Sequence, residues 1–206
     1  MKKIIMAAVI CISAALTLPF MVNKASAKDA DGDVVIVIDP GHGQDDPGSI
    51  ATTTGTYEKD CNLAIAKAMR EELCKYDGVK VYLTRTSDEW MTNTGRAMIA
   101  SALKADFLIS IHNNSGSATN SGCIAYRSLN SYYSEATNDM CSLITENLSS
   151  LGLKNGGVQT RTSTGFDYED YYTLIAEGVR AGIPSIIVEH CFLSCLLYTS
   201  PSPRDM

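Results

Sequence analysis

Four residues of this sequence have side chains whose types and positions could support metal-assisted hydrolysis. His42, His112 and Glu189 each follow an apolar run rich in β-branched residues, and such runs predict buried strands. Glu58 stands at the start of a predicted helix. Two histidines and one carboxylate can bind zinc tetrahedrally and leave the fourth position for water. A second carboxylate beside that water would be the base that hydrolysis requires.

The loop around His42 has the composition of a functional turn. The apolar run 34–38 leads into "VIDPGHGQDDPG", where glycines allow a sharp change of direction. His42 can therefore project from just beyond the carboxyl end of the strand, which is where ligands bind in open α/β sheets. The loop contains neither a G-x-G-x-x-G nor a Walker pattern, so phosphate binding is not predicted.

Each candidate also has a purely structural alternative. His112 could be a hydrogen-bonded histidine at a strand end, and Glu58 could favour the helix N-terminus electrostatically. Glu189 could pair with Arg85 or Arg96. For a single residue these alternatives are the stronger interpretation. The coincidence of all four candidates on one edge of a parallel sheet reverses that preference.

The third histidine of the chain, His190, is predicted to be structural. Neighbouring residues of a strand point to opposite faces, so His190 should point away from Glu189. The sequence also lacks an H-E-x-x-H motif, which excludes a metal site built on a single helix.

Strands and helices are expected to alternate along the chain. Strands are predicted at 34–38, 79–84, 107–111, 122–126 and 185–188, and helices at 57–76, 94–104, 132–151 and 171–181. The strand at 122–126 is expected at an edge, and 152–167 is expected to be a loop over the site. This alternation predicts an α/β fold of one domain, with a mostly parallel twisted sheet and helices on both faces.

The first residues have the features of a secretory signal peptide. Lys2 and Lys3 precede a long apolar segment, and Ala25-Ser26-Ala27 resembles a small-x-small cleavage site. An uncleaved anchor is the rival interpretation, but Pro19 and the cleavage site favour removal. We therefore predict a signal peptide at 1–27, a polar linker at 28–33, and a secreted protein without stable membrane insertion.

Charge argues against nucleic acid as a partner. The whole chain has 17 Lys and Arg and 23 Asp and Glu, and removal of 1–27 takes away three lysines and no acid. The mature chain would therefore have 14 basic and 23 acidic residues, a formal charge of −9. Binding of phosphate backbones needs clustered Lys and Arg. We also expect a monomer.

The mature chain would retain six cysteines without close C-x-x-C pairs. The preferred interpretation is that they are small buried apolar residues. One or two disulfides are the alternative, with a pairing that the sequence leaves open.

Several motifs in order resemble the zinc-dependent N-acetylmuramoyl-L-alanine amidases of the amidase-3 family. They are "VIDPGHGQDDPGS", "YEKDCNLAIAKAM", "VYLTRTSD", "ISIHNNS" and "AGIPSIIVEHCFLS", and the match spans roughly 34–194. The resemblance implies a catalytic domain over 34–194 with a mixed, mostly parallel sheet. It implies zinc held by His42, Glu58 and His112, with Glu189 as the catalytic acid and base.

The resemblance also implies a substrate. The family cuts the amide between the lactyl group of N-acetylmuramic acid and the L-alanine of the peptidoglycan stem peptide. Secretion fits such a substrate, because peptidoglycan lies outside the membrane. We therefore expect the protein to act outside the cell, at the cell wall.

Three further residues are weaker candidates. Asn113 and Asn114 follow His112 and could hold substrate amides, although a turn role is equally compatible. Asp39 could orient His42 as a hydrogen-bond acceptor, a common partner of ligating histidines.

The end of the chain departs from the family pattern. After Ser194 the sequence reads "CLLYTSPSPRDM", and its two Ser-Pro pairs do not favour a helix. We interpret 195–206 as a non-native tail, with a natural disordered tail as the alternative.

Two other functions are compatible with these residues. One is a zinc peptidoglycan peptidase or carboxypeptidase, and the other is a non-catalytic domain that binds the cell wall. The fourth candidate, Glu189, argues against a pure binding domain, because binding alone does not need a carboxylate beside the metal ligands.

Overall fold

The computed structural model describes residues 32–52, 54–117, 119–165 and 169–195 of the chain. The predicted signal peptide, most of the predicted linker and the predicted tail from residue 196 onward lie outside the described residues. Within them, no helix has the length and apolar character needed to cross a membrane.

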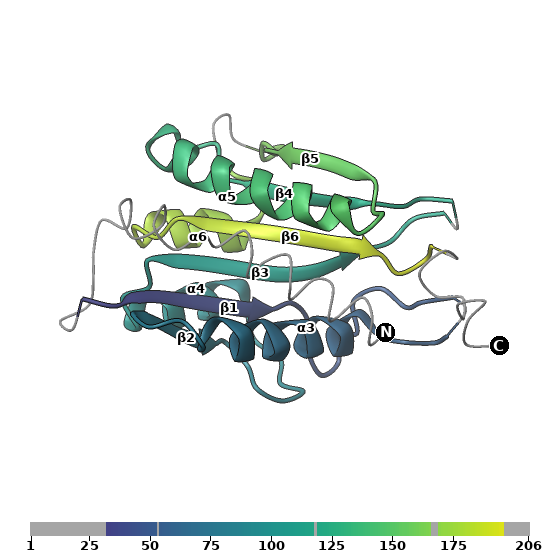
Figure 1. Cartoon of the computed structure of the whole chain (residues 1–206), viewed down its shortest axis with the longest axis horizontal. Helices are drawn as coiled ribbons and strands as arrows, with labels where there is room; N and C mark the ends of the chain where they lie inside the picture. The colour runs from purple at the N-terminus through teal and green to yellow at the C-terminus, as the bar shows by residue number, and fades with distance from the viewer. Residues whose placement is uncertain (1–31, 53, 118, 166–168, 196–206) are drawn as a thin grey trace.

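A six-stranded sheet forms the centre of the described structure, with helices on both faces (Figure 1). The elements in chain order are β1 (Val34–Pro40), α3 (Glu58–Leu73), β2 (Val79–Leu83), α4 (Asn93–Ala102), β3 (Phe107–Asn114), β4 (Cys123–Arg127), α5 (Ser131–Ser150), β5 (Asn155–Gln159), α6 (Thr173–Arg180) and β6 (Ser185–Phe192). The strand order across the sheet is β2-β1-β3-β6-β4-β5.

The sheet is mixed and mostly parallel, as predicted. Strands β2, β1, β3 and β6 run parallel, and β4 is antiparallel to β6 but parallel to β5. The predicted fold class is therefore confirmed. The order matters for function because β3 lies between β1 and β6, so the carboxyl ends of three parallel strands are neighbours.

Burial on both faces explains the continuous apolar run of β1. Val34, Ile36 and Ile38 pack into one core cluster with residues of α3 and α5. Val35 and Val37 pack into a second cluster with residues of α4 and α6. A strand covered by helices on both faces can bury every side chain, and all residues of β1 are buried.

Two predictions about the far side of the sheet were wrong. Strand β4 is not an edge strand, because β5 pairs with it, and β5 lies within the segment predicted to be a loop. Only Val158 of "NGGVQ" is aliphatic, so no periodic signal marks this strand. Gly156 is nevertheless required there, because an added Cβ would lie 2.6 Å from Ile124 Cγ1 and 2.7 Å from the Cys123 carbonyl.

Candidate metal centre

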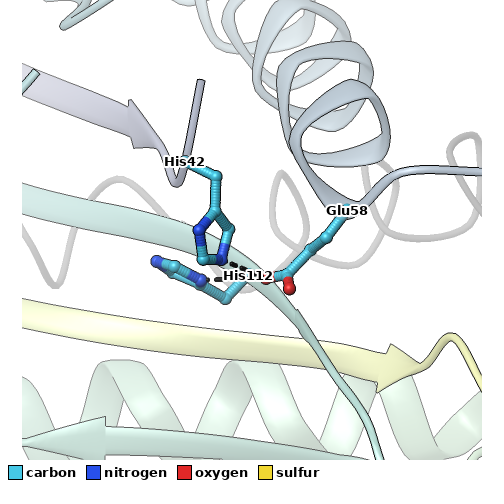
Figure 2. A group of neighbouring side chains, drawn as sticks. All are labelled: His42, Glu58 and His112. Carbon is cyan, nitrogen blue, oxygen red and sulfur yellow. Dashed lines mark hydrogen bonds and ion pairs between the residues drawn. The ribbon is translucent and has the colours of Figure 1, made fainter. Parts of the chain in front are cut away.

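Three of the four candidate residues meet at the carboxyl edge of β1 and β3. His42 lies in the loop that follows β1, His112 lies in β3, and Glu58 is the first residue of α3. Figure 2 shows their side chains pointing toward one another from these three elements. The start of α3 is at this edge because the connection 41–57 stays at the end of β1, with the Glu58 N–H donating to the Ser49 carbonyl at 2.8 Å.

The distances fit a group of metal ligands. Glu58 Oε1 lies 3.1 Å from His42 Nε2 and 3.0 Å from His112 Nδ1 (Figure 2). One donor atom from each residue lies within 4.8 Å of the others. Bonds of about 2 Å from three such atoms to one ion require only small shifts. The donor set, two imidazoles and a carboxylate, also matches the chemistry of zinc sites with an open position.

Charge holds the three side chains together in the metal-free protein. Burial alone would raise the pKa of Glu58, but hydrogen bonds from His112 and His42 hold it well below its usual range. Burial alone would lower the pKa of His42, but Glu58 and Asp46 outweigh burial and raise it to about 9. Glu58 is therefore an anion between the two histidines, and a metal ion bound there would take the place of the proton on His42.

The backbone of the His42 loop is held by two buried arginines. His42 has a φ of 64°, a left-handed conformation that is uncommon for residues other than glycine. Arg96 donates to the carbonyls of His42 and Pro40, and Arg85 donates to those of Pro40 and Gly41. These hydrogen bonds keep the loop in the conformation that directs the imidazole of His42 toward Glu58.

Asp39 does not orient His42, so that prediction was wrong. Its carboxylate forms an ion pair of 2.7 Å with Arg96 and accepts hydrogen bonds from Thr84 and Ser110. Asp46 takes the predicted role, with Oδ2 at 2.8 Å from His42 Nδ1. The sequence places Asp46 in the same loop, four residues after His42, but the loop conformation decides which carboxylate reaches the ring.

Two glycines of the loop give the ligands room. A Cβ on Gly41 would lie 2.3 Å from the His112 ring. A Cβ on Gly48 would lie 2.6 Å from His42 Cδ2 and 2.7 Å from Glu58 Oε2. The glycines in "GHGQDDPG" are therefore explained by the close packing of the three side chains as well as by the turn itself.

Asn113 supports the ligand group, and Asn114 takes part in a local turn. Asn113 is buried, and its amide donates to Asn62 Oδ1 at 2.7 Å while its backbone N–H donates to Glu58 Oε1. Asn62, one helical turn after Glu58, also donates to Glu58 Oε1 at 3.4 Å. The Asn114 side chain accepts a hydrogen bond from the Ser115 N–H, which supports the alternative of a local turn.

Glu189 faces the same cavity as the two histidines. It is the register partner of His112 across β3 and β6, so both side chains project from the same face of the sheet. The cavity has a volume of about 210 Å³, and its lining includes His42, His112 and Glu189. Glu189 Oε2 is covered from solvent and has no hydrogen-bond partner. Burial raises the pKa of Glu189 to about 7.

The structural alternative for Glu189 is not observed. Arg96 is paired with Asp39, and Arg85 is bound to backbone carbonyls, so neither arginine neutralises Glu189. A carboxylate that is kept without a partner beside two imidazoles is typical of a functional site, where perturbed pKa values cluster.

The cavity lining also includes residues that the sequence did not single out. Met91 and Asn93 come from the start of α4, and Tyr172 and Thr173 come from the start of α6. No local pattern marks them, because they reach the site only through the packing of α4 and α6 on the same face of the sheet.

His190 is structural, as predicted. It is buried on the opposite side of β6 from Glu189, and its Nδ1 lies 3.3 Å from the His112 carbonyl. Burial lowers its pKa to about 4. Of the six cysteines in the described residues, five are buried and Cys74 is exposed.

Comparisons with known proteins agree with this geometry. The model of the N-acetylmuramoyl-L-alanine amidase family matches residues 36–195. The chain is 48% identical over 87 residues, 42% of its own length, to the sporulation-specific N-acetylmuramoyl-L-alanine amidase of Bacillus subtilis, and this match covers 33% of that protein. The chain thus matches about a third of the length of that relative.

Solved structures of amidase domains have the same fold. The catalytic domain of CwlV from Bacillus (Paenibacillus) polymyxa aligns with a TM-score of 0.64 at 29% identity, over 80% of this chain and 83% of that one. An N-acetylmuramoyl-L-alanine amidase from Clostridium difficile 630 aligns with a TM-score of 0.67 at 27% identity, over 79% and 82%. With its fold, its cluster of candidate ligands and a family match over most of its length, the chain belongs to the N-acetylmuramoyl-L-alanine amidase family.

Proposed function

We propose that the protein is a zinc-dependent hydrolase that cleaves the amide between N-acetylmuramic acid and L-alanine in peptidoglycan. The observation that carries this proposal is the convergence of His42, Glu58 and His112, with the unpaired carboxylate of Glu189 in the same cavity. Membership of the amidase family supports the choice of bond and substrate.

The residues present fit a zinc ion. His42 Nε2, His112 Nδ1 and Glu58 Oε1 are the atoms that would hold it. Asp46 fixes the His42 ring through its other nitrogen, which is the usual arrangement around a ligating histidine. When bound by three protein ligands, zinc lowers the pKa of a water at its open position from about 15.7 toward about 7.

Glu189 moves the proton in this mechanism. Its carboxylate takes a proton from the attacking water as the water adds to the lactyl carbonyl, and then gives that proton to the departing alanine nitrogen. Burial favours this double role, because a carboxyl with a pKa raised to about 7 can both accept and donate a proton near neutral pH. Glu189 Oε2 has no hydrogen-bond partner among the described residues, so no other group there competes for the proton that Glu189 carries.

The place of action follows from the substrate. Peptidoglycan lies outside the membrane, so the protein acts after secretion and removal of residues 1–27, as a monomer in the cell wall. The acidic balance of the mature chain gives it no general attraction to anionic polymers, so recognition must come from the site itself.

The test combines zinc content with the release of stem peptides from purified sacculi. Glu189→Gln should keep one zinc per chain and lose at least about 100-fold in turnover, since it removes the acid and base but no ligand. Glu71→Gln, an exposed acid on α3, is the matched control and should behave as the unaltered protein does. Full turnover by Glu189→Gln would contradict the role given to Glu189. A zinc-loaded unaltered protein that binds sacculi but releases no stem peptides would favour a wall-binding domain.

Product analysis separates the amidase from a peptidoglycan peptidase or carboxypeptidase. The amidase releases an intact stem peptide that begins with L-alanine. A peptidase would instead release fragments of the stem peptide and leave L-alanine attached to the glycan.

A further inference from the structure

Residues 161–165 and 169–171 form a short arm between β5 and α6. Its two sides pair as antiparallel backbone: the Tyr171 N–H donates to the Arg161 carbonyl at 2.9 Å, and the Ser163 N–H donates to the Glu169 carbonyl at 2.8 Å. Asp170 anchors the arm to the segment after β4, accepting from the Ser128 hydroxyl at 2.6 Å and the Leu129 N–H at 2.8 Å. The backbone of Arg161 is therefore held at a defined position.

The side chain of Arg161 is held as well. Its guanidinium lies 3.6 Å from the centroid of the Tyr171 ring, and a hydrogen bond joins it to the side chain of Tyr172. Tyr172 packs against Tyr171 and Tyr126, with ring centroids 5.1 Å and 4.9 Å apart. An arginine stacked on an aromatic face loses little further conformational freedom when it binds a ligand.

These contacts place Arg161 next to a residue that lines the cavity. Tyr172, which contacts Arg161, also lines the cavity together with Glu189 and His112. The guanidinium itself is exposed to solvent. A group that extends from the cavity past Tyr172 would therefore meet Arg161.

Arg161 has no carboxylate partner among the described residues, unlike three other cations of the chain. Arg96 is paired with Asp39, and Lys59 is paired with Asp88. Arg180, on the far end of α6, is paired with Glu169 and Glu177. In a chain with more acids than bases, an oriented and unpaired guanidinium is available to an anion of the substrate.

We propose that Arg161 is a specificity-determining residue that binds a carboxylate of the stem peptide close to the amide that is cut. This inference rests on the proposed function, because it takes the stem peptide as the group that extends from the metal centre. A carboxylate fits better than a neutral amide, since the planar guanidinium can donate two parallel hydrogen bonds to its two oxygens. Tyr171 acts as a positioning residue that holds the guanidinium in place.

The test is equilibrium binding, which does not depend on turnover. Two muramyl dipeptides are compared, identical except that the second amino acid carries either a free carboxylate or its amide. Binding is measured by calorimetry with the zinc-loaded mature chain carrying Glu189→Gln, so that neither ligand is consumed. Adding Arg161→Gln should weaken binding of the carboxylate ligand about five- to tenfold, the range of a charge-assisted pair at a partly exposed position, and should leave the amide ligand unchanged.

Three further variants define the mechanism. Arg161→Lys should restore part of the affinity for the carboxylate, and Tyr171→Phe should retain it because the ring remains. Tyr171→Leu should weaken it in the same direction as Arg161→Gln. Arg180→Gln is the control for a general loss of charge and should have no effect, because that arginine is already paired.

Three results would overturn the proposal. The Arg161→Gln variant could bind both ligands as tightly as the parent protein, it could lose the same affinity for both ligands, or neither ligand could bind the parent protein. Failure of the proposed function has a different result, namely that the zinc-loaded protein without substitutions releases no stem peptides from sacculi. The two failures are therefore distinguishable, because one is read from affinity differences and the other from reaction products.

Discussion

The carboxylate of Asp46 lies 2.8 Å from Nδ1 of His42, on the side of the ring opposite Glu58, which faces Nε2 at 3.1 Å. The imidazole is thus held between two carboxylates. One of them belongs to the candidate ligand group, and the other fixes the ring orientation and leaves Nε2 directed into the site.

Removal of Asp46 should therefore weaken metal binding without removing a ligand. Asp46→Ala is expected to lower zinc affinity about 10- to 100-fold, the usual loss when the partner of a ligating histidine is removed. Affinity is measured by competition with a chromophoric chelator. Asp45→Ala is the control, because Asp45 is the exposed neighbour and has no bond to the ring. Equal zinc affinity in the two variants would show that Asp46 does not support His42.

A methyl group at Gly48 should displace the ligands. Its Cβ would lie 2.6 Å from His42 Cδ2 and 2.7 Å from Glu58 Oε2, so Gly48→Ala is expected to lose about 10- to 100-fold in zinc affinity. Gly55→Ala is a close control, because its φ of +68° matches the +64° of Gly48 and no atom lies within 4 Å of its added Cβ. That variant should lose about 1 to 2 kcal/mol of stability from backbone strain and keep its zinc affinity.

The pH dependence of turnover should report Glu189. A carboxyl group must be ionised to accept a proton, so kcat/KM is expected to fall as the pH drops through the pKa of Glu189. Burial raises that pKa from 4.5 to about 7, and the positive charge of a bound metal ion lowers it from there. The acidic limb should therefore lie between about 4.5 and about 7, with zinc content measured at each pH as the control. A flat profile down to pH 4 with zinc retained would contradict this assignment.

His190 should make the metal-free protein less stable in acid. Burial lowers its pKa from 6.5 to about 4, so the unfolded chain binds a proton between these values while the folded protein does not. Its contribution is fully present above pH 6.5 and is lost progressively toward pH 4, by roughly 3 kcal/mol in total.

The measurement compares urea unfolding of the protein and of His190→Asn in the presence of a chelator, at pH 7 and pH 4. The variant cannot gain a proton at this position, so it should lose less stability between the two values. Equal losses in both proteins would mean that the pKa of His190 is not lowered by folding.

The sequence by itself determined the parallel α/β core and the residues that meet at its edge. Strand β1 could be predicted because burial on both faces produces an uninterrupted apolar run, and β6 gave the same signal. Once those strands are parallel, His42 just after β1, His112 near the end of β3 and Glu189 near the end of β6 must lie at one edge. Glu58 was predictable because a helix that follows a parallel strand begins at the edge where that strand ends.

Only the tertiary structure decided which side chains support this group. Asp46 rather than Asp39 contacts His42 because the loop adopts a left-handed conformation at residue 42, which no local pattern specifies. The pairing of β5 with β4 and the position of Arg161 against Tyr171 depend on contacts between segments distant in the sequence or separated by a turn. Hydrophobic periodicity reports how deeply a segment is buried, whereas strand order and side-chain partners arise from the packing of the whole domain.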